Sequence, residues 1–154
     1  MQTLQLNLLA AWSGILLGFI SGLVFGLFFH REGWLGGYSS FKRRLYRLGH
    51  ISFFGLAVVN FMFYFTAQQF APGNPAMAIA SWAFLAGAVS MPLCCLFMAH
   101  FPRTHLLFGV PVLSLLLGAV LTVITVTDHT TRFTPHPSPA YAKSYGAPSP
   151  PAAP

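Results

Sequence analysis

The sequence predicts an all-α membrane protein, an antiparallel bundle of four transmembrane helices with a disordered C-terminal tail rich in proline and alanine. Of its 154 residues, 55% are hydrophobic and 6% are charged, whereas about a quarter of the residues in soluble domains are charged. Four apolar runs precede residue 127, each close to the roughly 20 residues that a helix needs to cross a bilayer. We therefore expect a membrane domain over residues 1–127, with helices at about 8–29, 50–69, 76–99 and 106–126.

The first apolar run contains a ladder of small residues. Gly14, Gly18, Gly22 and Gly26 recur every four positions, so they share a helix face that is almost without side chains and that a second helix can approach closely. The ladder predicts a helix contact, either within the chain or with another protein. The residues before this run lack the basic region and cleavage site of a signal peptide, so we expect the helix to be retained.

The segment 30–49, between the first two apolar runs, holds five of the eight basic residues. Its glycines predict the end of the first helix. Ser40 can cap a following helix, which is either a separate helix on the membrane surface or the polar extension of the second transmembrane helix. Four basic residues here are predicted to contact lipid headgroups: Lys42, Arg43, Arg44 and Arg47.

The second apolar run carries a polar stripe, because His50, Asn60 and Tyr64 share one helix face. Asn60 lies near the middle of the helix, where an unpaired amide is costly, so we expect Asn60 and Tyr64 to be buried against other helices. After this run, Asn74 is the predicted N-cap of the third helix and Pro75 its first residue.

Small residues recur in the third and fourth runs, where Gly87 and Gly118 are predicted helix-packing positions. Pro92 should kink the third helix. Residues 128–154 are rich in proline, alanine and serine, a composition that cannot build a core, so we expect this tail to be disordered.

The orientation is predicted from the charges. Six of the eight lysines and arginines fall in the first and third loops, which share one side of the membrane. Positively charged loops favour the cytoplasm. We therefore expect a multi-pass protein of the cell inner membrane, with the segment 30–49 in the cytoplasm and both termini in the periplasm or outside.

Histidines provide the candidate cofactor site, because one lies at the cytoplasmic end of each predicted helix. Imidazoles from several helices at one depth can bind haem iron or copper, although interfacial histidines give the same pattern without a cofactor. The sulfur residues between Met91 and Met98 would suit Cu(I), but they share the small-residue face, which favours core packing. The candidate ligands are His30, His50, His100 and His105.

The acidic residues limit the possible chemistry. Glu32 and Asp128 are the only two acids, and both lie outside the predicted helices, so no buried carboxylate is available for a proton relay or general base. We therefore expect a non-catalytic accessory or assembly subunit.

The expected partners of such a subunit are membrane lipids and other integral membrane subunits, or further copies of the chain. The alternatives are a small haem- or copper-binding electron-transfer protein and an oligomeric pore or transporter. Nucleic-acid binding is not expected, because the basic residues adjoin an apolar helix end, where they serve orientation and contact with lipid headgroups.

Overall fold

The computed structural model describes residues 2–70 and 73–132, which form four long helices without a strand. Each helical segment is long and apolar enough to cross a membrane, so the predicted fold class is confirmed. Short 3₁₀ helices, η1 (Trp34–Gly36) and η2 (Pro102–Phe108), lie in the first and third connections. The long helices are α1 (Gln2–Phe28), α2 (Phe41–Phe70), α3 (Pro75–His100) and α4 (Gly109–Arg132).

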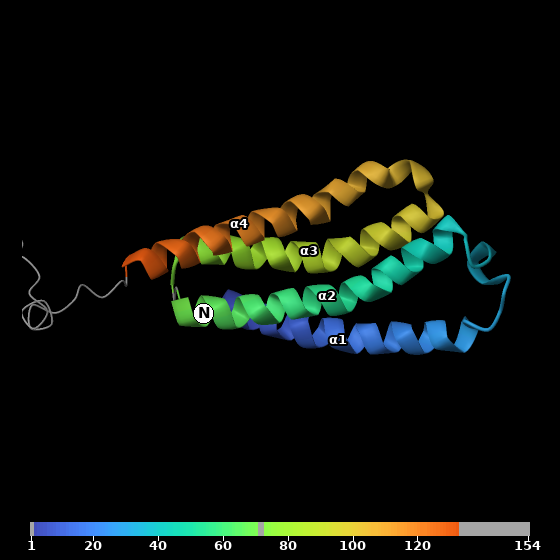
Figure 1. Cartoon of the computed structure of the whole chain (residues 1–154), viewed down its shortest axis with the longest axis horizontal. Helices are drawn as coiled ribbons and strands as arrows, with labels where there is room; N and C mark the ends of the chain where they lie inside the picture. The colour runs from blue at the N-terminus through green and yellow to red at the C-terminus, as the bar shows by residue number, and fades with distance from the viewer. Residues whose placement is uncertain (1, 71–72, 133–154) are drawn as a thin grey trace, which may run out of the picture.

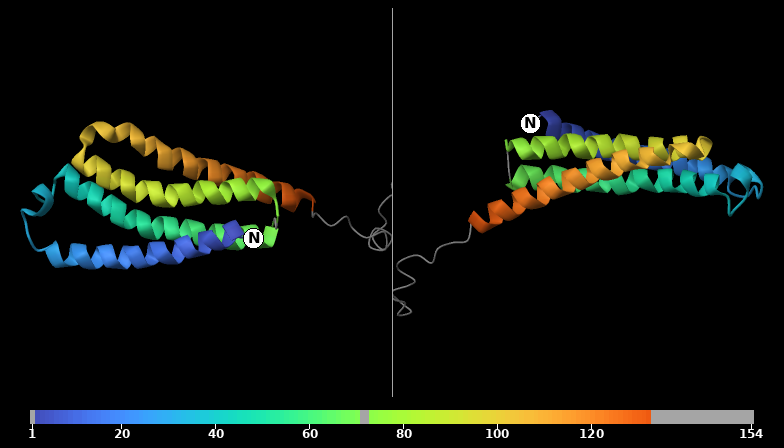
Figure 2. Two further views of the ribbon diagram at one scale, coloured as in Figure 1. Left: turned by 180° about the vertical axis from the view of Figure 1, so that it is seen from behind. Right: turned by 90° about the horizontal axis from the view of Figure 1, so that it is seen from above.

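The helices run antiparallel in chain order (Figure 1). α2 packs against α1 and α3, and α3 packs in turn against α4. α1 also contacts α3, whereas α4 touches α2 only sparsely, so α4 is the peripheral helix. Figure 2 shows the N-terminus and the end of α4 at one end of the bundle, opposite the α1–α2 and α3–α4 connections.

α1 and α2 both begin earlier than predicted. α1 begins at Gln2 rather than near residue 8, because the polar residue Asn7 is fully buried against the other helices. α2 begins at Phe41, so the basic residues are the polar extension of the transmembrane helix and not a separate surface helix. At roughly 1.5 Å per residue, α2 is about 45 Å long and exceeds the ~30 Å hydrocarbon core. Ser40 is its N-cap, with the Arg43 backbone N–H donating to the Ser40 hydroxyl at 3.1 Å.

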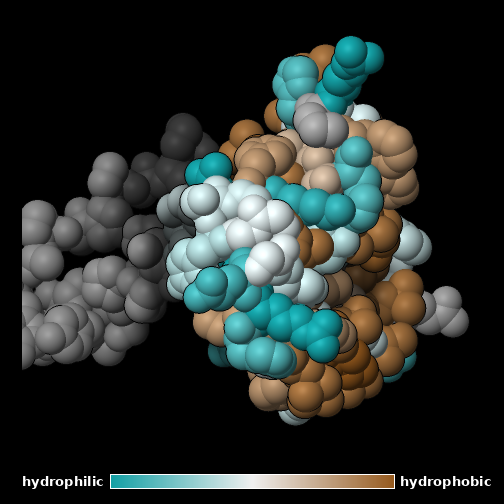
Figure 3. All heavy atoms as spheres, turned by 90° about the vertical axis from the view of Figure 1, so that its right-hand side faces the viewer, coloured by the Kyte–Doolittle hydropathy of each residue, from teal (hydrophilic) through white to brown (hydrophobic). Residues whose placement is uncertain are grey.

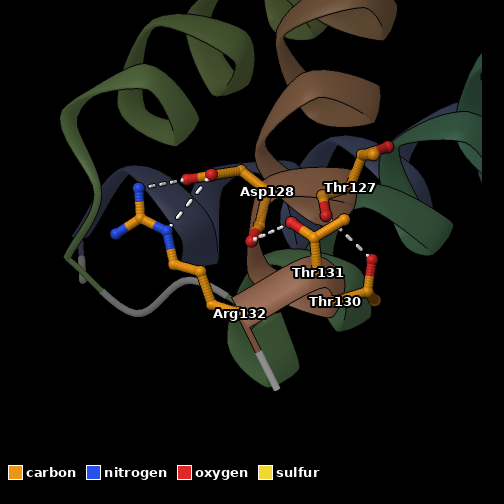
Figure 4. Close-up of polar contacts among 5 residues, drawn as sticks. All are labelled: Thr127, Asp128, Thr130, Thr131 and Arg132. Atoms are coloured by element: carbon orange, nitrogen blue, oxygen red, sulfur yellow. Dashed lines mark hydrogen bonds and ion pairs between the residues drawn. The ribbon is translucent and has the colours of Figure 1, made fainter. Parts of the chain in front are cut away.

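α4 continues to Arg132, beyond its predicted end near residue 126 and into the segment predicted to be a disordered tail. The Arg132 guanidinium contacts the Asp128 carboxylate one turn earlier at 2.9 Å. Thr130 and Thr131 donate to carbonyl oxygens three residues earlier (Figure 4). These local contacts extend the helix past the apolar run. Residues 133–154 of the predicted tail lie outside the described residues.

The glycine ladder of α1 faces α2 at three of its four positions. A Cβ added at Gly14 would lie 3.0 Å from a backbone carbonyl oxygen of α2, and one at Gly18 would lie 2.6 Å from an α2 aromatic ring. One at Gly22 would lie 3.1 Å from another α2 ring, whereas Gly26 has nothing within 4 Å. The partner of the ladder is therefore α2 of the same chain.

The other two predicted packing glycines lie between α3 and α4. A Cβ added at Gly118 of α4 would lie 3.1 Å from the Phe84 ring of α3. One added at Gly87 of α3 would collide with the Leu115 side chain of α4. Each glycine therefore accommodates a large side chain from the opposite helix, which explains the close approach of α3 and α4.

The hydrophobic core lies between α2 and α3, in the half of the bundle that carries the α2–α3 turn. The Phe63 and Phe84 rings are 5.0 Å apart at its centre. Partly buried apolar side chains of α1 and α4 pack against it, so all four helices meet in this cluster. Its buried members are Phe63, Ala67, Met77, Ala80 and Phe84.

Gly14→Leu should destabilise the bundle, because the α2 backbone lies where the new side chain must begin. We expect the free energy of unfolding in detergent micelles to fall by about 1–3 kcal/mol. Gly26→Leu is the matched control, since it makes the same change in the same helix with nothing within 4 Å. Equal losses in the two variants would contradict packing of the ladder on α2.

Candidate functional site

Three buried polar side chains, here called the polar junction, join α1, α2 and α3. The Asn7 amide donates to Oδ1 of Asn60 at 2.9 Å and to the carbonyl oxygen of Ser81 at 3.4 Å. The Ser81 hydroxyl is within hydrogen-bonding reach of Oδ1 of Asn7 and, at 3.2 Å, of the carbonyl oxygen of Thr3. The Asn60 amide donates to the carbonyl oxygen of Leu56 at 2.9 Å. Each junction residue thus bonds to the others or to nearby backbone.

The polar junction is closed to solvent, with exposed fractions of 0% for Asn7, 1% for Asn60 and 0% for Ser81. A buried amide without a partner costs about 1–3 kcal/mol, and a bilayer offers no water as a substitute. Since hydrogen bonds are directional, the junction also fixes the depth of the three helices relative to one another. Asn60 therefore has the partner within the bundle that its mid-helix position requires.

Two members of the junction, Asn7 and Ser81, are not predicted from the sequence. Asn7 directly precedes the apolar run that predicts the first helix, so the sequence predicts it to lie outside that helix. The sequence does indicate that Asn7 belongs to the packing face of this helix, because the face of Gly14 continues through Ala11 to Asn7 at helical spacing. Ser81 gave a weaker signal, since serine is common on small-residue faces of membrane helices.

A hollow of about 720 Å³, here called the end pocket, opens where α1 begins, α2 ends and α3 begins. Its apolar wall includes Leu4, Ala67 and Met77. Tyr64, which is predicted to be buried, is only half-buried and lies in the wall. The side chains that give the pocket its polar character are Thr3, Gln5, Tyr64, Gln68 and Asn74.

The polar junction lies one helical turn deeper than the wall of the end pocket. Four residues of helix correspond to a rise of about 6 Å, and each junction residue lies four positions from a wall residue. On each of the three helices, a junction residue therefore lies one turn below a residue of the pocket wall. The pairs are Thr3 and Asn7 on α1, Tyr64 and Asn60 on α2, and Met77 and Ser81 on α3.

Arg43 is buried at the opposite end of the bundle, with 2% of its surface exposed. Its guanidinium lies over the rings of Phe29, Trp34 and Tyr38, at 5.0, 5.7 and 4.8 Å from their centroids. It also donates to the carbonyl oxygen of Phe29 at 3.3 Å, just past the end of α1, where a cation is favourable. The prediction that Arg43 contacts lipid headgroups is therefore wrong, because it holds the first connection against α2.

The remaining basic residues of this segment stay at the surface. Arg44 and Arg47 are exposed and Lys42 is half-buried. Figure 3 views the bundle from this end and shows hydrophilic residues across it, with hydrophobic residues mainly on the right and at the bottom of the view. Contact of these three side chains with lipid headgroups stays a prediction.

The four candidate histidines do not converge on one site. His50 is half-buried, with Nδ1 2.8 Å from the Ser21 hydroxyl of α1. His100 has Nδ1 3.0 Å from a carbonyl oxygen of its own helix, and His30 and His105 are exposed. Within residues 2–70 and 73–132, no three His, Cys, Asp or Glu side chains are grouped closely enough to hold a metal. This geometry does not supply the converging imidazoles that the haem or copper hypothesis requires.

The two cysteines of α3 are buried packing residues. Cys94 Sγ lies 3.3 Å from the carbonyl oxygen of Leu107 in η2. A Cβ added at Gly49 of α2 would lie 3.4 Å from Cβ of Cys95. Small polarizable side chains suit such close contacts. The cysteines thus pack α3 against its neighbours, as the core-packing interpretation predicts.

Comparison of the chain with models of known protein families, with curated proteins and with solved structures finds no match. Function must therefore be inferred from the chain's own residues. These provide a neutral polar junction, a pocket above it with uncharged hydrogen-bonding groups, and a basic end held together by Arg43.

Asn7→Leu and Asn60→Leu should each lower the free energy of unfolding by about 0.5–2 kcal/mol, because each leaves a buried partner unpaired. The double variant should lose less than the sum, since the second substitution removes the group left unpaired by the first. Unfolding titrations in mixed micelles measure this coupling. Thr66→Val is the control, because Thr66 bonds only within α2, to the carbonyl oxygen of Met62. Strictly additive losses would contradict a direct bond between the two asparagines.

Proposed function

We propose that the chain is a non-catalytic subunit of a membrane complex, which packs through α4 against another integral membrane protein. The observation that carries the proposal is the uneven burial of the four spans. In the most apolar stretch of each span, 11% of the residues are buried in the α1 and α4 spans, against 28% in α2 and 39% in α3. The outer helices therefore have wide apolar faces for a partner.

Of the two outer helices, α4 is the better candidate for binding another membrane protein. α1 packs on both α2 and α3, whereas α4 packs mainly on α3 and uses its small face for that contact. The ladder of α1 is engaged on α2 at three positions and is not free for a second protein. On α4, the exposed apolar side chains include Leu113, Leu116, Val120 and Val123.

The interior of the bundle supports a structural role. Its polar junction is made of neutral groups that bond to one another and to backbone. Asp128 lies on the exposed end of α4 and pairs with Arg132, and Glu32 is exposed in the first connection. Both carboxylates are exposed, so neither is the buried acid that a proton relay within a membrane would need.

The alternative functions have less support. A haem or copper site built from several of the candidate histidines has no support, because no three His, Cys, Asp or Glu side chains are grouped within the described residues. A pore formed by several copies would need the polar stripe of α2 to face the surface of the bundle. Asn60 instead lies inside the bundle and bonds to Asn7.

For orientation, we place the connection between α1 and α2 in the cytoplasm of the cell and the end of α4 outside, following the bias of basic residues. Ser39→Cys and Thr130→Cys introduce exposed cysteines at opposite ends of the bundle. In intact cells, a membrane-impermeant thiol reagent should label Thr130→Cys and not Ser39→Cys. The parent chain is the control, because Cys94 and Cys95 are buried. Labelling of Ser39→Cys alone would reverse the orientation.

Site-specific photo-crosslinking in intact membranes tests the proposed function. A benzophenone amino acid at Leu116 or Val120 of α4 should give a discrete adduct with one other integral membrane protein. The same group at Leu16, on the exposed face of α1, is the matched control and should give much less of it. Adducts with lipid alone at both α4 positions would contradict a partner on this helix, and an adduct of twice the chain's mass would show that the partner is a second copy.

A further inference from the structure

The geometry points to the end pocket as a binding site for an uncharged amphiphilic lipid, with an oxygen-bearing head and an apolar tail, of which a diacylglycerol is an example. The pocket volume of about 720 Å³ lies within the range of roughly 300–1,000 Å³ that small-molecule sites occupy. The site lies at one end of the helices, where a lipid head would meet it. This inference is independent of the partner proposed for α4.

The hydrogen-bonding groups of the pocket are available to a ligand. Within the described part of the chain, no side-chain hydrogen bond is found for Thr3, Gln5, Tyr64 or Gln68. Hydroxyl and carboxamide groups can both donate and accept. Together they can bind the ester carbonyl and hydroxyl oxygens of a neutral lipid head.

The absence of charge selects against phosphate-bearing heads. The described residues that line the end pocket include no Asp, Glu, Lys, Arg or His. A separate hollow of about 460 Å³ lies on the other side of the turn residues Gly73 to Pro75, and Asp128 and Arg132 line it. These two side chains form an ion pair with each other (Figure 4). An anionic head in the end pocket would meet no cationic side chain among the described wall residues and only the N-termini of α1 and α3, which attract an anion more weakly than a paired charge does.

The apolar part of the wall calls for an apolar tail. Ala67 and Met77 are each 2% exposed, so the apolar surface open to a tail is that of half-buried Leu4 and of exposed Pro75 and Ala78. A purely polar ligand would leave this wall without a favourable contact, whereas an acyl chain would cover it.

The polar junction closes the pocket from below. Asn7, Asn60 and Ser81 are at most 1% exposed and lie one turn deeper than the wall. A ligand therefore stops at this depth, so the site is a blind pocket and not the mouth of a channel.

Native mass spectrometry of the full chain, released from mild detergent, tests the inference with two lipids of equal chain length. Dioctanoylglycerol should bind about tenfold more tightly than dioctanoyl phosphatidylglycerol, which adds an anionic phosphate and a second glycerol. Tyr64→Phe and Gln68→Leu should each weaken dioctanoylglycerol binding about two- to tenfold. Gln69→Leu is the matched control, because the adjacent Gln69 is exposed and does not line the pocket, and it should bind like the parent chain.

Ala78→Trp separates this pocket from adsorption elsewhere on the bundle. Ala78 is exposed and lines the pocket, so a tryptophan there should fill it without disturbing the core and should reduce dioctanoylglycerol binding more than tenfold. An unchanged unfolding transition without lipid confirms that each variant is folded. Dioctanoylglycerol binding that survives Ala78→Trp, or equal effects of Gln68→Leu and Gln69→Leu, would overturn the proposed site. Phosphatidylglycerol binding that is as tight and is also lost in Ala78→Trp would overturn its selectivity.

Discussion

The hydrogen bond between Asn7 and Asn60, with Ser81 beside it, is the constraint on which the rest of the bundle depends. In a bilayer interior, a buried carboxamide has no water to bond, so each helix that carries one must meet a partner at a matching depth. This requirement fixes the depth of α1, α2 and α3. The hydrophobic core then forms beside the junction and the end pocket above it, whereas α4 has no member in the junction and packs mainly on α3.

Different interactions hold the two ends of the bundle. Around the polar junction, neutral groups bond within a dry interior. Further along α1, Gly14, Gly18 and Gly22 allow close contact with α2. At the far end, Arg43 bonds to the end of α1 and lies over three aromatic rings of the connection. A charge is tolerated there because aromatic faces and a helix C-terminus surround it.

The four helices, the N-caps at Ser40 and Asn74 and the start of α3 at Pro75 could be predicted from the sequence, because apolar runs and capping residues are local signals. Predictions that required tertiary contacts were incomplete. The mid-helix position of Asn60 predicts that it needs a partner, but the partner, Asn7, lies 53 positions away, just before the apolar run that marks the first helix. Arg43 carries the same charge as its exposed neighbour Arg44, and only the fold places it among aromatic rings. The sequence predicts the four histidines at the same end of the helices. In the structure, His50 contacts Ser21 of α1, whereas the other three histidines are exposed.

Hydrogen exchange of side-chain amides by NMR tests the central claim most directly, because it reports on the junction without altering it. When the ¹⁵N-labelled chain in micelles is transferred to D₂O, the carboxamide signals of Asn7 and Asn60 should persist long after that of exposed Gln69 has vanished. A cross-peak should link the two asparagine side chains. Exchange of Asn7 and Asn60 as fast as that of Gln69, without a cross-peak, would contradict a buried junction between α1 and α2.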